Sequence, residues 1–187
     1  MATKIYIDQG HNPVNPNAGA EGNGLREQDL VFVIGRELAD ILNANGFETR
    51  LSRPTAATQL GTSLATSLAA RVNGANSWGA DYFVSLHTNA SSVESASGSE
   101  AFVYSRSGRA YPLAENILFQ LNAVTGLRDR GVMPRPSLYV LRRTAMPAVL
   151  VELGFITNPY DAELMRSRPT EFAVGVANGL LAYLGLL

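Results

Sequence analysis

The sequence has 187 residues and no cysteine, which excludes thiol catalysis, iron–sulfur clusters and cysteine-ligated zinc. The 15 basic and 16 acidic residues give a net charge of −1, which argues against a nucleic-acid-binding protein, because such proteins usually carry a basic excess. Hydrophobic residues make up 46% of the chain and no apolar run approaches the ~20 residues of a membrane helix, so we expect one folded domain over residues 1–187.

The first half of the chain alternates short strands with helices. Residues 4–8 alternate as a strand does, and residues 10–24, rich in Gly, Asn and Pro, are predicted to form a loop. A helical period begins at Arg26 and stops at Gly46. Next come a predicted strand, a polar loop, a helix and a nearly all-apolar strand, over residues 47–51, 52–62, 63–78 and 82–86.

The second half continues this alternation after a Ser-rich loop over residues 89–99. Its predicted elements are three strands and two helices, with the strands over 101–104, 138–141 and 148–151 and the helices over 111–124 and 170–184. Strands that alternate with helices form parallel sheets covered on both sides. We therefore predict an α/β fold: a single three-layer domain with a mostly parallel twisted sheet of about six strands and helices on both faces.

Ionisable side chains follow three of the predicted strands. His11 lies just after the first strand, His87 ends the third, and Glu152 ends the last. Because the carboxyl ends of parallel strands meet at one edge of a sheet, these side chains should emerge close together. Glu27 opens the first helix, which should begin near the same edge.

Two imidazoles and two carboxylates suit a zinc hydrolase. A catalytic zinc site uses three protein ligands and leaves a fourth position for water, and the remaining carboxylate can act as general base and then acid. Spacing alone does not distinguish Glu27 from Glu152 in these roles. A lone His after a strand or a Glu in a first helical turn is more often structural, whereas Glu152 follows four apolar residues and must be paired, protonated or functional.

Several segments form a pattern that spans nearly the whole chain. They are residues 5–11, 25–27, 71–76, 80–90, 98–100, 130–132 and 147–158. In this order the segments resemble the zinc-dependent N-acetylmuramoyl-L-alanine amidases of the amidase 3 family. The first segment departs from that family, which usually has Pro at the position of Gln9 and a Gly pair at Asn12-Pro13.

The resemblance implies one Zn2+ per chain, held by His11, Glu27 and His87, with Glu152 as the catalytic acid and base. It implies hydrolysis of the amide bond between N-acetylmuramic acid and L-alanine in peptidoglycan, as in autolysins and endolysins. Peptidoglycan is then the expected partner of a monomer, with no nucleic acid or membrane partner and no separate wall-binding domain. The expected place of action is the cell wall, outside the cell or after lysis, although no signal peptide is visible.

Substrate contacts and rival functions remain open in the sequence. Asn89, Arg130 and Arg142 are candidates for substrate binding, the two arginines because a cation near the developing oxyanion would help. A zinc metallocarboxypeptidase-like peptidase is one alternative function. A non-catalytic peptidoglycan-binding module is another, but such a module would not need the second carboxylate.

Overall fold

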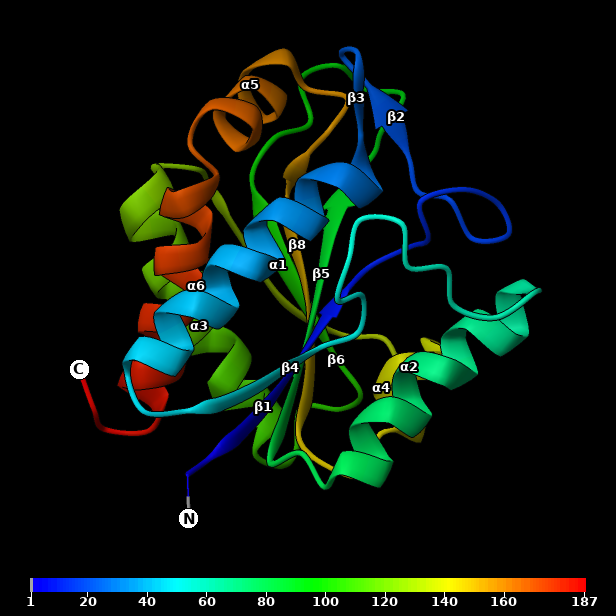
Figure 1. Cartoon of the computed structure of the whole chain (residues 1–187). Helices are drawn as coiled ribbons and strands as arrows, with labels where there is room; N and C mark the ends of the chain where they lie inside the picture. Colours follow the sequence, from blue (N-terminus) through cyan, green and yellow to red (C-terminus); the bar gives the residue numbers. More distant parts are fainter. Residues whose placement is uncertain (1) are drawn as a thin grey trace.

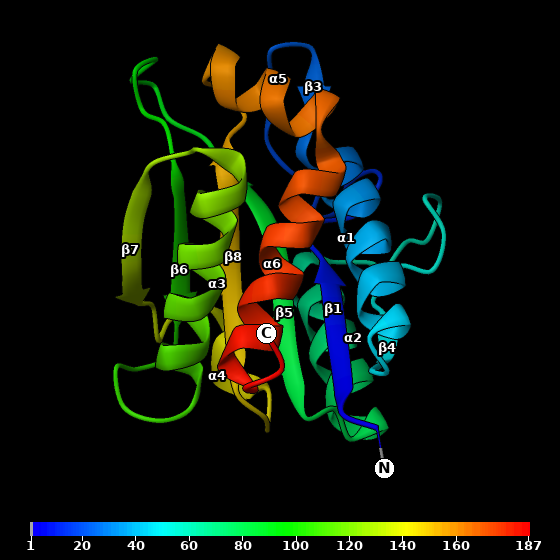
Figure 2. The ribbon, with the colours of Figure 1, turned by 90° about the vertical axis from the view of Figure 1, so that its left-hand side faces the viewer.

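One six-stranded sheet organises the molecule (Figure 1). Its strand order is β4-β1-β5-β8-β6-β7 (Figure 2). The computed structural model describes residues 2–187. The six strands are β1 (Lys4–Gln9), β4 (Glu48–Leu51), β5 (Tyr82–Asn89), β6 (Ser99–Val103), β7 (Asp129–Pro134) and β8 (Ala148–Phe155). All neighbouring strands are parallel except β6 and β8, which pair antiparallel. This confirms the predicted mostly parallel sheet.

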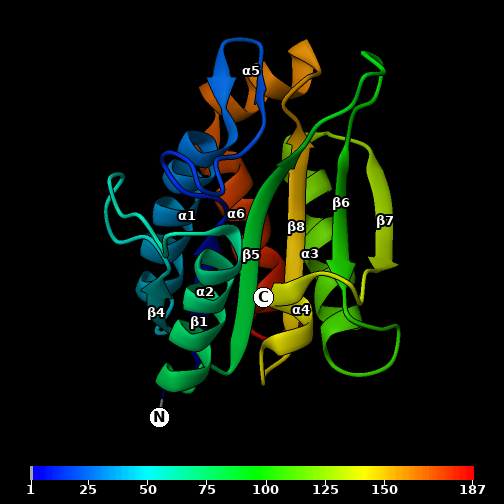
Figure 3. The ribbon, with the colours of Figure 1, turned by 90° about the vertical axis from the view of Figure 1, so that its right-hand side faces the viewer.

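Helices cover both faces of the sheet, as predicted (Figures 2 and 3). On one face lie α1 (Glu27–Ala44), α3 (Ala110–Thr125) and α6 (Pro169–Tyr183). On the other lie α2 (Leu64–Trp78) and the short α4 (Tyr139–Arg143). The helix α5 (Pro159–Ser167) follows β8 near the carboxyl edge of the sheet (Figure 1). Among the described residues, no helix is both long and apolar enough to cross a membrane.

Alternate residues of each strand face different helical layers, because side chains along a strand point to opposite faces. In β1, Ile5 and Ile7 join the larger core with α1, α3 and α6, whereas Tyr6 joins the smaller core with α2 and α4. In β8, Val149 and Val151 face the larger core, so Leu150 faces the smaller one. This alternation decides which face carries the polar residues at the strand ends.

Residues 138–141 were predicted to be a strand, and this prediction is wrong. Leu138 is the N-cap residue of α4, whose helix begins at Tyr139 and packs Val140 and Leu141 into the smaller core. A run of four apolar residues satisfies a buried strand and a buried helical turn equally well, so periodicity cannot separate them.

Three further features of the fold were not predicted: one edge strand, one small hairpin and one helix. The edge strand β7 contains Asp129, Gly131 and Pro134, residue types that are depleted in strands. The two-residue strands β2 (Glu21–Gly22) and β3 (Leu25–Arg26) form a small hairpin within and just after the predicted loop over residues 10–24. The third element, α5, is too short to show a clear apolar period, although Asn158 caps it and Pro159 begins it.

Candidate active site

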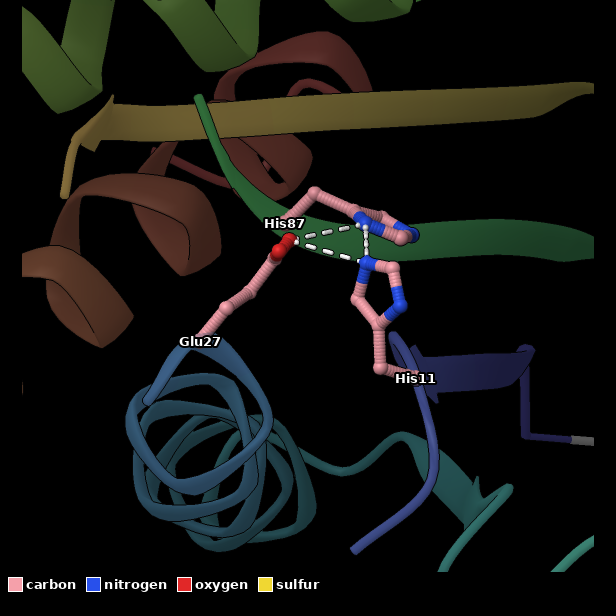
Figure 4. A group of neighbouring side chains, drawn as sticks. All are labelled: His11, Glu27 and His87. Carbon is pink, nitrogen blue, oxygen red and sulfur yellow. Dashed lines mark hydrogen bonds and ion pairs between the residues drawn. The ribbon is translucent and has the colours of Figure 1, made fainter. Parts of the chain in front are cut away.

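The three predicted ligands meet near the carboxyl ends of β1 and β5 (Figure 4). His11 Nε2 lies 3.1 Å from His87 Nδ1 and 3.2 Å from Glu27 Oε1, and His87 Nδ1 lies 3.1 Å from the same Glu27 oxygen. His11 follows β1, His87 lies near the end of β5, and Glu27 is the first residue of α1. The structure thus joins one residue from each of three elements.

The geometry of this triangle fits a tetrahedral zinc ion. Ligands about 2.0 Å from zinc in a tetrahedral arrangement are about 3.3 Å apart, close to the three separations observed here. The donor set of two imidazole nitrogens and one carboxylate oxygen is one that zinc uses in hydrolases. The side chains of His11 and His87 are 21% and 19% exposed and that of Glu27 is 4% exposed, so the triangle is reached from the imidazole side.

Backbone amides hold the carboxylate of Glu27 in place. Oε2 accepts a hydrogen bond from the Ala20 N–H at 2.8 Å, and Oε1 accepts one from the Thr88 N–H at 2.9 Å. Burial by itself would raise the pKa of Glu27. The hydrogen bonds and charges of His11 and His87 outweigh burial and hold this pKa well below its ordinary value. Glu27 is therefore ionised and held in one orientation, as a metal ligand would need to be.

Glu152 lies beside this triangle on the same face of the sheet. It is the register partner of His87 across the parallel β5–β8 pair. Register partners place their side chains on the same face of the sheet. Here it is the face that α2 and α4 cover. Oε2 of Glu152 is buried without a hydrogen-bond partner among the described residues. Burial, followed by the negative charges of Glu27 and Glu100, raises the pKa of Glu152 to about 8.

Two of the three candidate substrate residues converge on Glu100, next to Glu152. Asn89 donates from Nδ2 to Glu100 Oε1 at 2.6 Å, and Arg130 donates from Nε to Glu100 Oε2 at 3.1 Å. The third candidate, Arg142, lines a separate cavity of about 250 Å³ together with Tyr104 and Arg109.

Two groups of residues that the structure places at the site have no role predicted from the sequence. Glu100 was noted only as part of the segment 98–100, and the glutamate following Gly98-Ser99 was the available signal. Asp8 and Arg71 form a buried ion pair at 2.6 Å below His11. The signals in the sequence were an acid at the end of an apolar strand and an arginine that begins the segment 71–76, and the two residues lie 63 positions apart.

Comparison with known proteins gives the same family along the whole domain. Residues 5–182 match the family model described as N-acetylmuramoyl-L-alanine amidase, Amidase_3. The chain is 38% identical over 182 residues to N-acetylmuramoyl-L-alanine amidase CwlM of Bacillus licheniformis, covering 95% of this chain and 67% of that protein. It is 37% identical over 183 residues to N-acetylmuramoyl-L-alanine amidase LytC of Bacillus subtilis (strain 168), covering 96% of this chain and 35% of that protein.

A solved structure agrees with this match. N-acetylmuramoyl-L-alanine amidase AmiC2 of Nostoc punctiforme superposes with a TM-score of 0.84 at 31% sequence identity, covering 98% of this chain and 97% of that chain. The chain spans about two thirds of CwlM and about one third of LytC. Since the family model covers nearly every element that builds the site, the chain belongs to the N-acetylmuramoyl-L-alanine amidase family, Amidase_3.

Proposed function

We propose that this chain is a zinc-dependent amidase that hydrolyses the bond between the lactyl group of N-acetylmuramic acid and L-alanine in peptidoglycan. The observation that carries this proposal is one arrangement. Three donor atoms lie 3.1–3.2 Å apart, and beside them lies the carboxylate of Glu152, whose Oε2 is buried without a hydrogen-bond partner among the described residues. The family membership supplies the substrate.

In this proposal His11, Glu27 and His87 hold the metal. When bound, zinc supplies Lewis-acid catalysis, which polarises a carbonyl group and makes water more acidic. The partial exposure of both imidazoles leaves room for substrate on that side, while the backbone amides of Ala20 and Thr88 keep the Glu27 carboxylate from turning. The chain therefore offers a preformed ligand set.

Glu152 is the proposed general base and general acid. A carboxylate oxygen of Glu152 removes a proton from the attacking water as the new C–O bond forms at the lactyl carbonyl carbon. The same carboxyl group then gives that proton to the L-alanine nitrogen as the C–N bond breaks. The products are a lactyl carboxylate and a peptide with a free L-alanine amino terminus. In the metal-free protein, burial and the charges of Glu27 and Glu100 raise the pKa of Glu152 to about 8, so its carboxyl group exchanges a proton near neutral pH, as a general base and acid must.

Asn89 and Arg130 are the proposed substrate contacts, because both bind Glu100, which is the strand partner of Glu152. Arg142 remains a weaker candidate, since it lines a separate cavity. Peptidoglycan lies outside the cell membrane, so we propose that the protein acts on the cell wall, outside the cell or after lysis. We also propose that residues 1–187 act as one catalytic domain and as a monomer, which sedimentation would test.

Digestion of purified cell walls tests the proposed reaction. Wild type should release muropeptides with new L-alanine amino termini, identified by mass spectrometry, and no free carboxyl-terminal amino acids. Release of carboxyl-terminal amino acids would instead favour a carboxypeptidase, and binding without products would favour a wall-binding module. Glu152→Gln should keep zinc but lose about 100-fold or more in rate, because the proton acceptor is gone. The exposed Glu94→Gln is the matched control and should cleave like wild type.

A further inference from the structure

The guanidinium of Arg71 is buried beneath the segment that carries His11. Arg71 lies on α2 and is 1% exposed. Its Nη1 donates to Asp8 Oδ1 at 2.6 Å and to the Gln9 carbonyl at 2.7 Å. Its Nη2 donates to the His11 carbonyl and lies 3.4 Å from Asn12 Oδ1. All four acceptors belong to residues 8–12, so one side chain binds this whole segment.

The main chain at His11 has a conformation that needs such support. Its φ is +64°, in the left-handed region that non-glycine residues rarely adopt. A conformation of this kind persists only when the surroundings hold it. Arg71 binds the carbonyls of Gln9 and His11, on either side of Gly10, whose N–H donates to the Leu86 carbonyl at 3.0 Å. The turn that directs the His11 imidazole is thus held from both sides.

Arg71 is itself fixed by Asp8. The second carboxylate oxygen of Asp8 accepts a hydrogen bond from the Ser85 hydroxyl of β5 at 2.7 Å. Burial alone would raise the pKa of Asp8, but Arg71 and Ser85 lower it below its ordinary value, so Asp8 is ionised. Asp8 alone is sufficient to neutralise the charge of Arg71. The hydrogen bonds from Arg71 to the Gln9 and His11 carbonyls are not needed for charge balance, so their effect is to fix the position of the main chain.

We propose that Arg71 is a positioning residue for the metal: its planar guanidinium holds the main chain at residues 9–11 so that Nε2 of His11 faces His87 Nδ1 and Glu27 Oε1. This inference rests on the proposed zinc site. Arginine is suited to the task because its donors form a rigid fork, whereas a lysine ammonium is a point charge that cannot span a carboxylate and two carbonyls in the same geometry.

The test measures zinc dissociation constants by competition with a chromophoric chelator near neutral pH. Arg71→Lys keeps the charge opposite Asp8 and loses the fork, and it should bind zinc about 10- to 100-fold more weakly, as is usual when a residue that orients a ligand is replaced. The control is Leu180→Ala, which opens a cavity in α6 on the other face of the sheet. It should lower the melting temperature at least as much yet leave zinc affinity within about 2-fold, because distant sites act independently.

The outcomes separate positioning from general stability. Wild-type affinity in Arg71→Lys would overturn the proposal, and so would an equal loss of affinity in Leu180→Ala. If Arg71→Lys does not fold, Asp8→Asn replaces it, since it keeps the shape of Asp8 but removes the charge that fixes Arg71. That variant should bind zinc at least about 3-fold more weakly, and unchanged affinity would overturn the proposal. Failure of wild type to take up any zinc would instead refute the metal site, and this inference with it.

Discussion

Glu100 and Glu152 are directly opposite each other in the antiparallel β6–β8 pair, so two carboxylates share one face of the sheet beside the His11–Glu27–His87 triangle. Their surroundings differ. Glu100 is neutralised by Arg130 and accepts a hydrogen bond from Asn89, whereas Glu152 Oε2 is buried without a partner among the described residues. Environment thus gives the two carboxylates different roles: Glu100 is held in an ion pair, whereas the unpartnered Glu152 has a raised pKa.

The first prediction concerns Glu152 and the pH dependence of stability in the metal-free protein. The ordinary carboxyl pKa of 4.5 is raised to about 8 in the folded state. The folded state therefore binds this proton more tightly, and the resulting stability is present below about pH 4.5 and lost as the pH rises through about 8. Glu152→Gln has no such loss, so above about pH 8 it should melt at least about 2 °C higher than wild type.

Thermal melts of both proteins across this pH range, with a chelator present, check this first prediction. The two melting curves should converge toward acidic pH, where Glu152 is protonated in the folded protein. Glu94→Gln, an exposed change, should follow wild type throughout. A wild type more stable than Glu152→Gln at alkaline pH would contradict the raised pKa.

The second prediction is that zinc stabilises the folded protein, and that this stabilisation requires both His11 and His87. Zinc at about 100 times its dissociation constant should stabilise wild type by about 2.7 kcal/mol. That gain corresponds to a rise in melting temperature of about 5–10 °C, and a chelator should abolish it. His11→Ala and His87→Ala should hold well below one zinc per chain by elemental analysis and show little shift. A full equivalent of zinc in either variant would remove that histidine from the ligand set.

The third prediction compares two arginines. Arg130→Gln removes the ion-pair partner of Glu100 and a proposed substrate contact, so kcat/KM on purified walls should fall about 10-fold, equivalent to about 1.4 kcal/mol. Arg142→Gln is the matched change at the separate cavity and should have the smaller effect. A larger loss in Arg142→Gln would exchange the roles assigned to the two residues.

The fourth prediction concerns Gly10, which packs against His87. A Cβ atom at Gly10 would lie 2.5 Å from His87 Cε1, 2.6 Å from Nε2 and 2.7 Å from the Leu86 carbonyl oxygen. Gly10→Ala should therefore displace the imidazole and lower both zinc content and activity. Gly154→Ala is the control, because a Cβ there would meet its nearest neighbours at 3.4 Å. Full zinc occupancy in Gly10→Ala would contradict this prediction, because it would show that the His87 imidazole accommodates the added methyl group.

Much of this protein follows from its sequence. The alternation of apolar strands with amphipathic helices predicts an α/β fold, because the apolar faces of the helices are buried by packing against the two faces of the sheet. His11, His87 and Glu152 were identified as candidates because each lies at the end of a strand, and the ends of parallel strands meet at one edge. Glu27 joined them as the first residue of a helix that starts there, and resemblance supplied the separate roles of the two carboxylates.

Tertiary structure alone decided the rest, because those features depend on contacts between distant segments. The antiparallel pairing of β6 with β8 places Glu100 opposite Glu152, and no local sequence pattern predicts this pairing. Arg71 reaches residues 8–12 across about 60 positions of sequence. The run over residues 138–141 became the start of α4, since a short apolar segment takes the form that its packing partners allow.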